Sequence, residues 1–132
     1  MNIVHELPSA AEYLALKDAA GQAGMVEEAV KTALKNSLFA VTARGADGRL
    51  IGIGRVIGDG GCYYQVVDVN ADPAFLDSGL DEAILKELLE YLDQHAPEGA
   101  AIMVVADVQG IPLYQKNGFK LMYPDYYGMV RA

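Results

Sequence analysis

The chain has 132 residues, 52% of them hydrophobic, and a formal net charge of −8. This size and apolar content predict one domain, residues 1–132, while the acidic balance disfavours nucleic-acid binding and mildly favours cationic partners such as amines. The single cysteine excludes an internal disulfide, and the two histidines lie too far apart in sequence for a clustered metal site. The sequence has no 18-residue apolar run and no basic leader, so we expect a cytoplasmic protein with no membrane partner.

The first third of the chain predicts a short strand and two helices. The strand covers residues 3–7. Ser9-Ala10-Ala11-Glu12 has the pattern of a capping box and begins the first helix, which Gly21 and Gly24 end. The second helix runs from Met25 to about Lys35.

After the second helix, the spacing of the apolar residues changes from that of helices to that of strands. Residues 38–44, 50–57 and 62–69 read as three consecutive strands, joined by glycine-rich turns at 45–48 and 58–61. Short turns of this kind connect antiparallel neighbours, so we expect a meander. Within it, Gly52 and Gly54 predict a bend or a close approach of another backbone.

An acidic segment follows the meander and leads into the clearest helix of the chain. Apolar residues at helical spacing form a stripe that starts at Leu80 and ends at Leu92. A helix N-terminus attracts anions, yet the chain supplies its own carboxylates here, at Asp72, Asp77, Asp81 and Glu82. We expect either a ligand site or a helix start that is capped by its own residues, with Asp77 or Ser78 as the N-cap.

The last part of the chain predicts three more strands and one short helix. Residues 101–106 are continuously apolar, as in a central strand covered on both faces. A helix at 111–116 follows, then a strand from Phe119 and a last strand at 128–131. The order β-α-α-β-β-β-α-β-α-β-β predicts an α/β (mixed α+β) fold whose central sheet is mixed, mainly antiparallel, and covered by helices on both faces. The step from strand 62–69 to strand 101–106 is expected to be a right-handed parallel crossover.

Two motifs in this order resemble the Gcn5-related N-acetyltransferase (GNAT) superfamily, and the chain is most similar to its small bacterial single-domain members. One is Val67-Asp68-Val69-Asn70-Ala71-Asp72-Pro73-Ala74-Phe75, followed by the loop that contains Gly79. The other is Leu113-Tyr114-Gln115-Lys116-Asn117-Gly118-Phe119. The resemblance implies transfer of an acetyl group from acetyl-CoA to a primary amine of a small, cationic acceptor by direct attack.

The resemblance also assigns roles to residues. Tyr114 matches the acid that protonates the leaving thiolate. Asp68 either accepts the amine proton or forms an ion pair with Arg55. The backbone around Val69, Asn70 and Ala71 would hold the pantetheine arm and polarise the thioester. The remaining expected cofactor contacts are Leu76, Asp77, Ser78, Gly79, Leu80, Asp81, Glu82, Asp107 and Lys116.

The cofactor loop departs from the family pattern in two places. Leu76 stands where relatives have Gln or Arg, and Asp81 stands where they have Gly or Ala. A lost charge-assisted contact is typically worth about 1.5–3 kcal/mol. A second interpretation is therefore a GNAT-like domain with weakened or lost CoA binding that acts as a binding or interaction module. A third is an enzyme whose acyl donor lacks the CoA pyrophosphate.

The tyrosine-rich C-terminus allows two interpretations. Its residues Tyr123, Tyr126 and Tyr127 either line an acceptor pocket, together with Asp59, Tyr63 and Tyr64, or the tyrosines serve in packing and at an interface. Together with the exposed end of the sheet, they make a homodimer possible.

Overall fold

The computed structural model describes residues 2–131. Its centre is one five-stranded sheet in which the strands follow one another in chain order. The strands are β1 (Asn2–Val4), β2 (Phe39–Arg44), β3 (Leu50–Gly58), β4 (Tyr63–Ala71) and β5 (Ala101–Val104). Strands β1 to β4 are antiparallel and β4 pairs with β5 in parallel, which confirms the predicted mixed, mainly antiparallel sheet.

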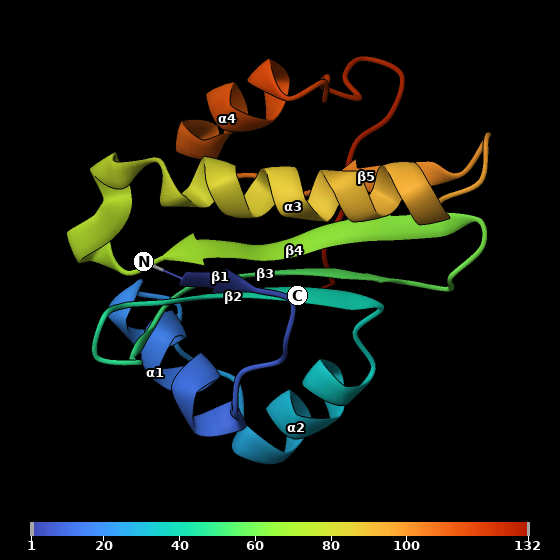
Figure 1. Ribbon diagram of the computed structural model, residues 1–132. Helices are drawn as coiled ribbons and strands as arrows, with labels where there is room; N and C mark the ends of the chain where they lie inside the picture. The colour runs from blue at the N-terminus through green and yellow to red at the C-terminus, as the bar shows by residue number, and fades with distance from the viewer. Residues whose placement is uncertain (1, 132) are drawn as a thin grey trace.

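Helices cover both faces of the sheet, as predicted. Figure 1 shows α1 (Ala10–Ala19) and α2 (Glu27–Lys35) on one side, and α3 (Leu80–His95) and α4 (Ile111–Lys116) on the other. Two 3₁₀ turns, η1 (Pro73–Ser78) and η2 (Val108–Gly110), precede α3 and α4. In residues 2–131 no helix combines the length and the apolar character that crossing a membrane requires.

The predicted capping box begins α1. Ser9 Oγ accepts a hydrogen bond from the Glu12 backbone N–H at 3.1 Å, and Glu12 Oε1 accepts one from the Ser9 N–H, also at 3.1 Å. Because two otherwise unpaired N–H groups are satisfied, the chain enters the helix at a defined residue. The apolar side of α1 then packs with α2 over β3 in a small core that contains Tyr13, Leu16 and Val30.

Helix α3 lies directly on strand β3 because two glycines make room for it. A Cβ atom added at Gly52 would lie 2.7 Å from Ile84 Cδ1, and one at Gly54 would lie 2.6 Å from Ile84 Cγ2 and 2.8 Å from Leu88 Cδ1. The predicted stripe from Leu80 to Leu92 is buried in this contact. The groups that approach these glycines are therefore side chains of α3, and not another backbone as the sequence suggested.

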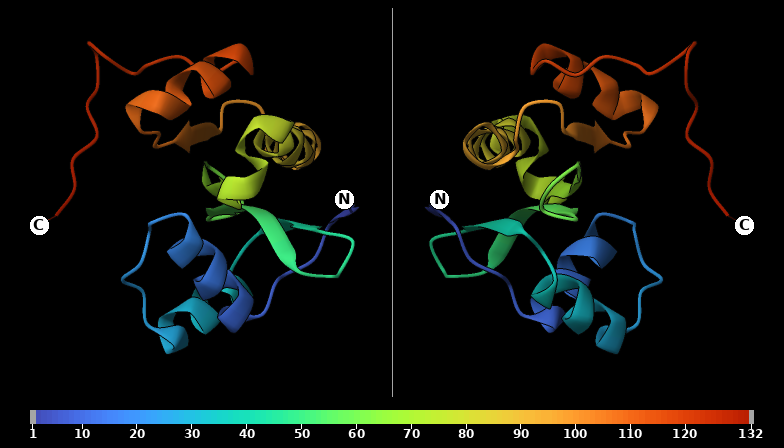
Figure 2. Two further views of the ribbon diagram at one scale, coloured as in Figure 1. Left: turned by 90° about the vertical axis from the view of Figure 1, so that its left-hand side faces the viewer. Right: turned by 90° about the vertical axis from the view of Figure 1, so that its right-hand side faces the viewer.

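The prediction for the end of the sheet is wrong. Strand β5 is an edge strand and not a central one, with Ile102 and Met103 exposed. The strands predicted from Phe119 and at 128–131 do not form in the described residues, and every residue from 120 to 131 is exposed. A strand needs a ladder partner, and this segment runs away from the body of the molecule (Figure 2).

Candidate active site

A cleft opens where β4 and β5 stop pairing. The parallel ladder ends at Val66 and Val104. The rest of β4 and the residues that follow β5 form the two walls of a cleft of about 300 Å³. Helix α4 and the end of α1 close its sides. The lining residues include Lys17, Gln22, Val66, Val67, Asp68, Val69, Asn70, Asp81, Val104, Val105, Ala106, Asp107, Gly110, Leu113 and Tyr114.

Strand β4 carries a β-bulge at this cleft. Arg55 of β3 is opposite Val67 and Ile53 is opposite Asn70, so two residues of β4 face Gly54 alone. One of the two is Asp68, whose φ of 60° makes it the one non-glycine residue with positive φ among residues 2–131. A bulge takes backbone groups out of the ladder and is common beside active sites. It lies directly before Asn70 and Ala71, the backbone expected to hold the pantetheine arm.

The Asp68 carboxylate is held by three donors. Tyr13 Oη donates to Oδ2 at 2.8 Å, Lys17 Nζ to Oδ1 at 2.7 Å, and Arg55 Nε to Oδ2 at 2.8 Å. The carboxylate is only 9% exposed. Burial alone would raise the pKa of Asp68, but the hydrogen bonds from Lys17 and Arg55 outweigh it and hold the pKa below its ordinary value. The ion pair between Asp68 and Arg55, one of the two alternatives that the sequence offered for Asp68, is present.

Tyr114 reaches the cleft from α4. Its ring packs edge-on against Phe119, with the centroids 5.7 Å apart, and its hydroxyl has no hydrogen-bond partner among the described residues. Burial raises the pKa of the Tyr114 phenol, and the nearby carboxylates of Asp81 and Asp107 raise it further. The phenol therefore stays protonated at neutral pH, as a proton donor requires.

The start of α3 differs from the prediction. The N-cap is neither Asp77 nor Ser78 but Gly79, with a φ of 79° and no side-chain cap. Ser78 Oγ instead donates to the Phe75 carbonyl at 2.6 Å inside η1. The left-handed residue that ends η1 also turns the chain into α3, and glycine adopts that conformation without strain.

The two acidic residues in the first turn of α3 have different partners. Asp81 lines the cleft, and its Oδ1 accepts the Glu82 N–H at 2.8 Å. Glu82 accepts hydrogen bonds from Lys116 Nζ at 3.1 Å and Asn117 Nδ2 at 3.2 Å, which lower its pKa. The structure thus brings the expected cofactor residues Glu82 and Lys116 together, in contact with each other and outside the lining of the cleft.

The other predicted loop residues lie apart from the cleft. Leu76 is 60% exposed, and Asp77 and Ser78 are exposed too. Asp107 does line the cleft, but its Oδ1 accepts the Gly110 N–H at 2.7 Å and so caps η2. Of the predicted set, the structure gathers around the cleft Asp68, Val69, Asn70, Asp81, Asp107 and Tyr114, whereas Ala71 is buried and is not part of the lining.

Sequence reasoning missed the contribution of the first helix. Lys17 lines the cleft, and Gln22 follows just after α1. A signal was available, because Tyr13 and Lys17 are spaced i, i+4 and so share one face of α1. Among residues 2–131, Lys17 is the one basic residue in the lining, which also contains the carboxylates of Asp68, Asp81 and Asp107. The cleft is therefore acidic.

A mixed sheet whose one parallel pair opens into a cleft beside a bulged strand defines an acetyltransferase-like architecture. Among solved structures, a probable acetyltransferase from Staphylococcus aureus is 33% identical with a TM-score of 0.93, over 99% of this chain and 98% of its own. A GNAT-family acetyltransferase from Streptococcus pneumoniae is 23% identical with a TM-score of 0.80, over 99% and 96% of the two chains. The chain belongs to the GNAT superfamily.

A third similar structure was solved in complex with CoA. It is a GNAT-family N-acetyltransferase from Escherichia coli, 20% identical with a TM-score of 0.66, over 91% of this chain and 68% of its own. At this identity the likeness is one of fold. No family model matches the chain, and no curated protein matches it.

Proposed function

We propose that the protein transfers the acetyl group of acetyl-CoA to a primary amine of a small, cationic acceptor by direct attack. One observation carries the proposal: the cleft between β4 and β5 combines a bulged backbone edge with the phenol of Tyr114, which has no hydrogen-bond partner among residues 2–131 and whose pKa burial raises. These are the two groups that the transfer needs, a backbone donor for the thioester oxygen and an acid for the leaving sulfur.

The residues have the following roles in this proposal. Backbone N–H groups at Val69 to Ala71 hold the pantetheine arm and polarise the thioester carbonyl. The acceptor nitrogen attacks the carbonyl carbon, the C–S bond breaks, and the thiolate takes the proton of Tyr114. The phenolate regains a proton from solvent, which also receives the proton that the amine loses.

We assign Asp68 to holding the bulge and not to accepting the amine proton. Its oxygens already accept hydrogen bonds from Tyr13, Lys17 and Arg55. The lowered pKa of the Asp68 carboxyl makes it a weak base. Asp68 is thus a positioning residue, because it fixes the strand that would carry the arm.

The charge of the cleft supports a cationic acceptor. Three carboxylates and one lysine line it, so its field attracts amines and repels acidic acceptors. The same field works against the donor's pyrophosphate near Asp81. We expect acetyl-CoA to bind mainly through its arm, and more weakly than it would with a cation in place of Leu76.

A second candidate is a binding module that retains the fold with little or no CoA affinity. The exposed Leu76 and the cleft-lining Asp81 favour it, because neither residue helps to bind a phosphate. A donor without the pyrophosphate would be compatible with the same two residues.

An assay of thiol release separates these possibilities. The protein is mixed with acetyl-CoA and one amine from a series that runs from polyamines to acidic amino acids, and free thiol is measured. We expect release that depends on the amine and is fastest with the polyamines. No release with any amine would favour the binding module, and faster release from S-acetylpantetheine than from acetyl-CoA would favour the other donor.

A further inference from the structure

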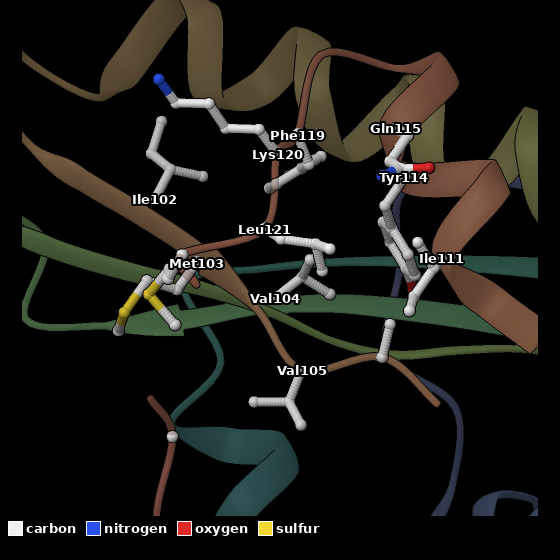
Figure 3. Close-up of a pocket in the computed structure, with 13 residues that line it drawn as sticks. Ile102, Met103, Val104, Val105, Ile111, Tyr114, Gln115, Phe119, Lys120 and Leu121 are labelled. Atoms are coloured by element: carbon white, nitrogen blue, oxygen red, sulfur yellow. The ribbon is translucent and has the colours of Figure 1, made fainter. Parts of the chain in front are cut away.

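A second cavity, of about 280 Å³, lies on the outer side of β5. Figure 3 shows it as a groove between β5 and the chain that follows α4. Its walls are mostly apolar, and Lys120 is the one charged residue that the described chain contributes to them. The apolar walls include Ile102, Met103 and Val104 from β5 and Phe119, Leu121 and Met122 from the chain beyond α4.

The C-terminal segment of the chain is itself a wall of this groove. Gly128 belongs to the lining together with residues 119–122. Glycine has no side chain, and a Cβ atom added at Gly128 would meet no atom of a non-adjacent residue among 2–131 within 4 Å. The segment therefore bounds the groove and leaves space inside it for a ligand.

The groove and the candidate active site share part of their walls. Val104, Val105, Ala106 and Tyr114 line both cavities. Figure 3 shows the side chain of Tyr114 beside Ile111, at one end of the groove. A molecule bound at Tyr114 therefore borders the acidic cleft on one side and the apolar groove on the other.

We propose that the groove receives the acyl chain of the donor, and that the protein accepts unbranched saturated acyl groups of about six carbons besides acetyl. In the proposed transfer the donor sulfur lies beside the Tyr114 hydroxyl, and the carbonyl carbon is bonded to that sulfur. A chain that continues from this carbon begins at the wall that the two cavities share. This donor specificity rests on the proposed function and extends it.

The size and the polarity of the groove suit such a chain. A cavity of about 150 Å³ is large enough for the six carbons of benzene, and the groove is larger. An alkyl chain has no polar atom, so apolar walls can bury it without leaving a donor or acceptor unpaired. The acidic cleft would hold the cationic amine, so the two reactants would occupy cavities of different character.

The transfer itself is unchanged by the length of the chain. The amine nitrogen forms the new C–N bond with the carbonyl carbon, and the C–S bond breaks. The thiolate takes the proton of Tyr114, and solvent receives the proton that the amine loses. No oxidant, reductant or further reactant is needed.

Calorimetry with acetyl-CoA and hexanoyl-CoA tests the groove. Hexanoyl has four more CH₂ groups than acetyl, and each CH₂ removed from water tightens binding by about fourfold. Because the groove is partly open to solvent, we expect hexanoyl-CoA to bind at least about tenfold more tightly than acetyl-CoA. If acetyl-CoA binds and hexanoyl-CoA binds no better, the groove proposal fails and the proposed function stands. If neither binds, both fail.

A charge in the groove should remove the advantage of the longer chain. Leu121→Asp makes burial of an alkyl chain unfavourable, so hexanoyl-CoA should bind no more tightly than acetyl-CoA. Met103→Asp introduces the same change from β5. The matched control is Leu7→Asp, because Leu7 is 46% exposed, Leu121 is 57% exposed, and only Leu121 lines the groove. A hexanoyl-CoA advantage that persists in both groove variants would place the chain elsewhere and overturn the proposal.

The product shows whether the bound chain is transferred. Wild-type protein is mixed with hexanoyl-CoA and the amine that releases thiol fastest from acetyl-CoA, and the acylated amine is identified by its mass. We expect the six-carbon amide, and less of it with Leu121→Asp than with Leu7→Asp. Transfer of acetyl but not of hexanoyl to the same amine would contradict the proposed donor specificity.

Discussion

Tyr114 is the side chain on which the proposed chemistry depends most. It lies in the cleft, its hydroxyl has no partner among the described residues, and burial raises its pKa. A phenol of this kind can give its proton to a thiolate that forms next to it. The acid role requires the hydroxyl, whereas the ring also has a packing role against Phe119.

Removing that hydroxyl is expected to slow turnover without weakening donor binding. Tyr114→Phe keeps the contact with Phe119, so acetyl-CoA affinity should not change, while kcat should fall by about 10²-fold or more. Steady-state kinetics and calorimetry measure the two quantities. Tyr91→Phe is the matched control, because that ring stacks on Phe39 and does not line the cleft. Equal turnover in wild type and Tyr114→Phe removes Tyr114 from the mechanism.

The charge of Asp81 is expected to limit acetyl-CoA affinity. Asp81→Asn removes the negative charge from the cleft but keeps an oxygen that can accept the Glu82 N–H. We expect tighter binding, by up to about tenfold for 1.4 kcal/mol. Asp77→Asn makes the same change of net charge on an exposed residue of the same loop, outside the cleft lining, and should have little effect. If both variants bind alike, Asp81 does not oppose the donor.

At the scale of elements, the bulge of β4 depends on side chains from two neighbours. Tyr13 and Lys17 come from α1, Arg55 comes from β3, and all three bind Asp68. Arg55 also donates to the Ser37 hydroxyl at 2.9 Å, beyond the end of α2. The cluster therefore joins the N-terminal helices to the strand that forms one wall of the cleft.

Breaking this cluster is expected to be costly. Asp68→Ala leaves two cations without their shared partner, and removing one member of a buried ion pair typically costs about 3–5 kcal/mol. Glu28→Ala breaks an exposed pair with Lys31 and should cost less than about 1 kcal/mol. Urea denaturation of both variants measures the difference. Similar losses would mean that Asp68 does not stabilise the bulge.

The junction of α1 and β2 is expected to be sensitive to acid. The hydrogen bond from Arg44 lowers the pKa of Glu12 from 4.5 to about 2. A carboxyl whose pKa is lowered in the folded protein stabilises the fold at every pH above its pKa in the unfolded chain. That contribution disappears as the pH falls from 4.5 to about 2. Glutamine also fits a capping box but carries no charge. The Glu12→Gln variant should therefore have a lower unfolding free energy than wild type above pH 4.5, and this difference should disappear as the pH falls to about 2. A difference in unfolding free energy that stays constant with pH would contradict this account.

At the scale of the whole molecule, local patterns predicted the sheet up to β4 and the helices. The glycine-rich turns predicted the antiparallel strands, and the apolar stripe from Leu80 to Leu92 predicted α3. Both predictions succeeded because each pattern lies in or next to the element that it specifies. The first family motif also lies on β4, whose residues line the cleft. The pairing of Asp68 with Lys17 was missed, because the two residues are 51 positions apart.

The end of the sheet was predicted wrongly for a different reason. A run of apolar residues such as 101–106 indicates burial on both faces but does not say what covers the outer edge. In the structure β5 is that edge, and residues 120–131 are exposed. Whether such a segment forms a strand depends on a partner strand, which no local pattern specifies.

The central claim is that acetyl-CoA binds to this fold, and thermal unfolding with added acetyl-CoA tests it most directly. A ligand at 100 times its dissociation constant stabilises the folded state by about 2.7 kcal/mol. We predict a rise in the unfolding temperature that saturates with acetyl-CoA and appears at lower concentration for Asp81→Asn. An unfolding temperature that does not change at millimolar acetyl-CoA, in the wild type and in the variant, would contradict the account.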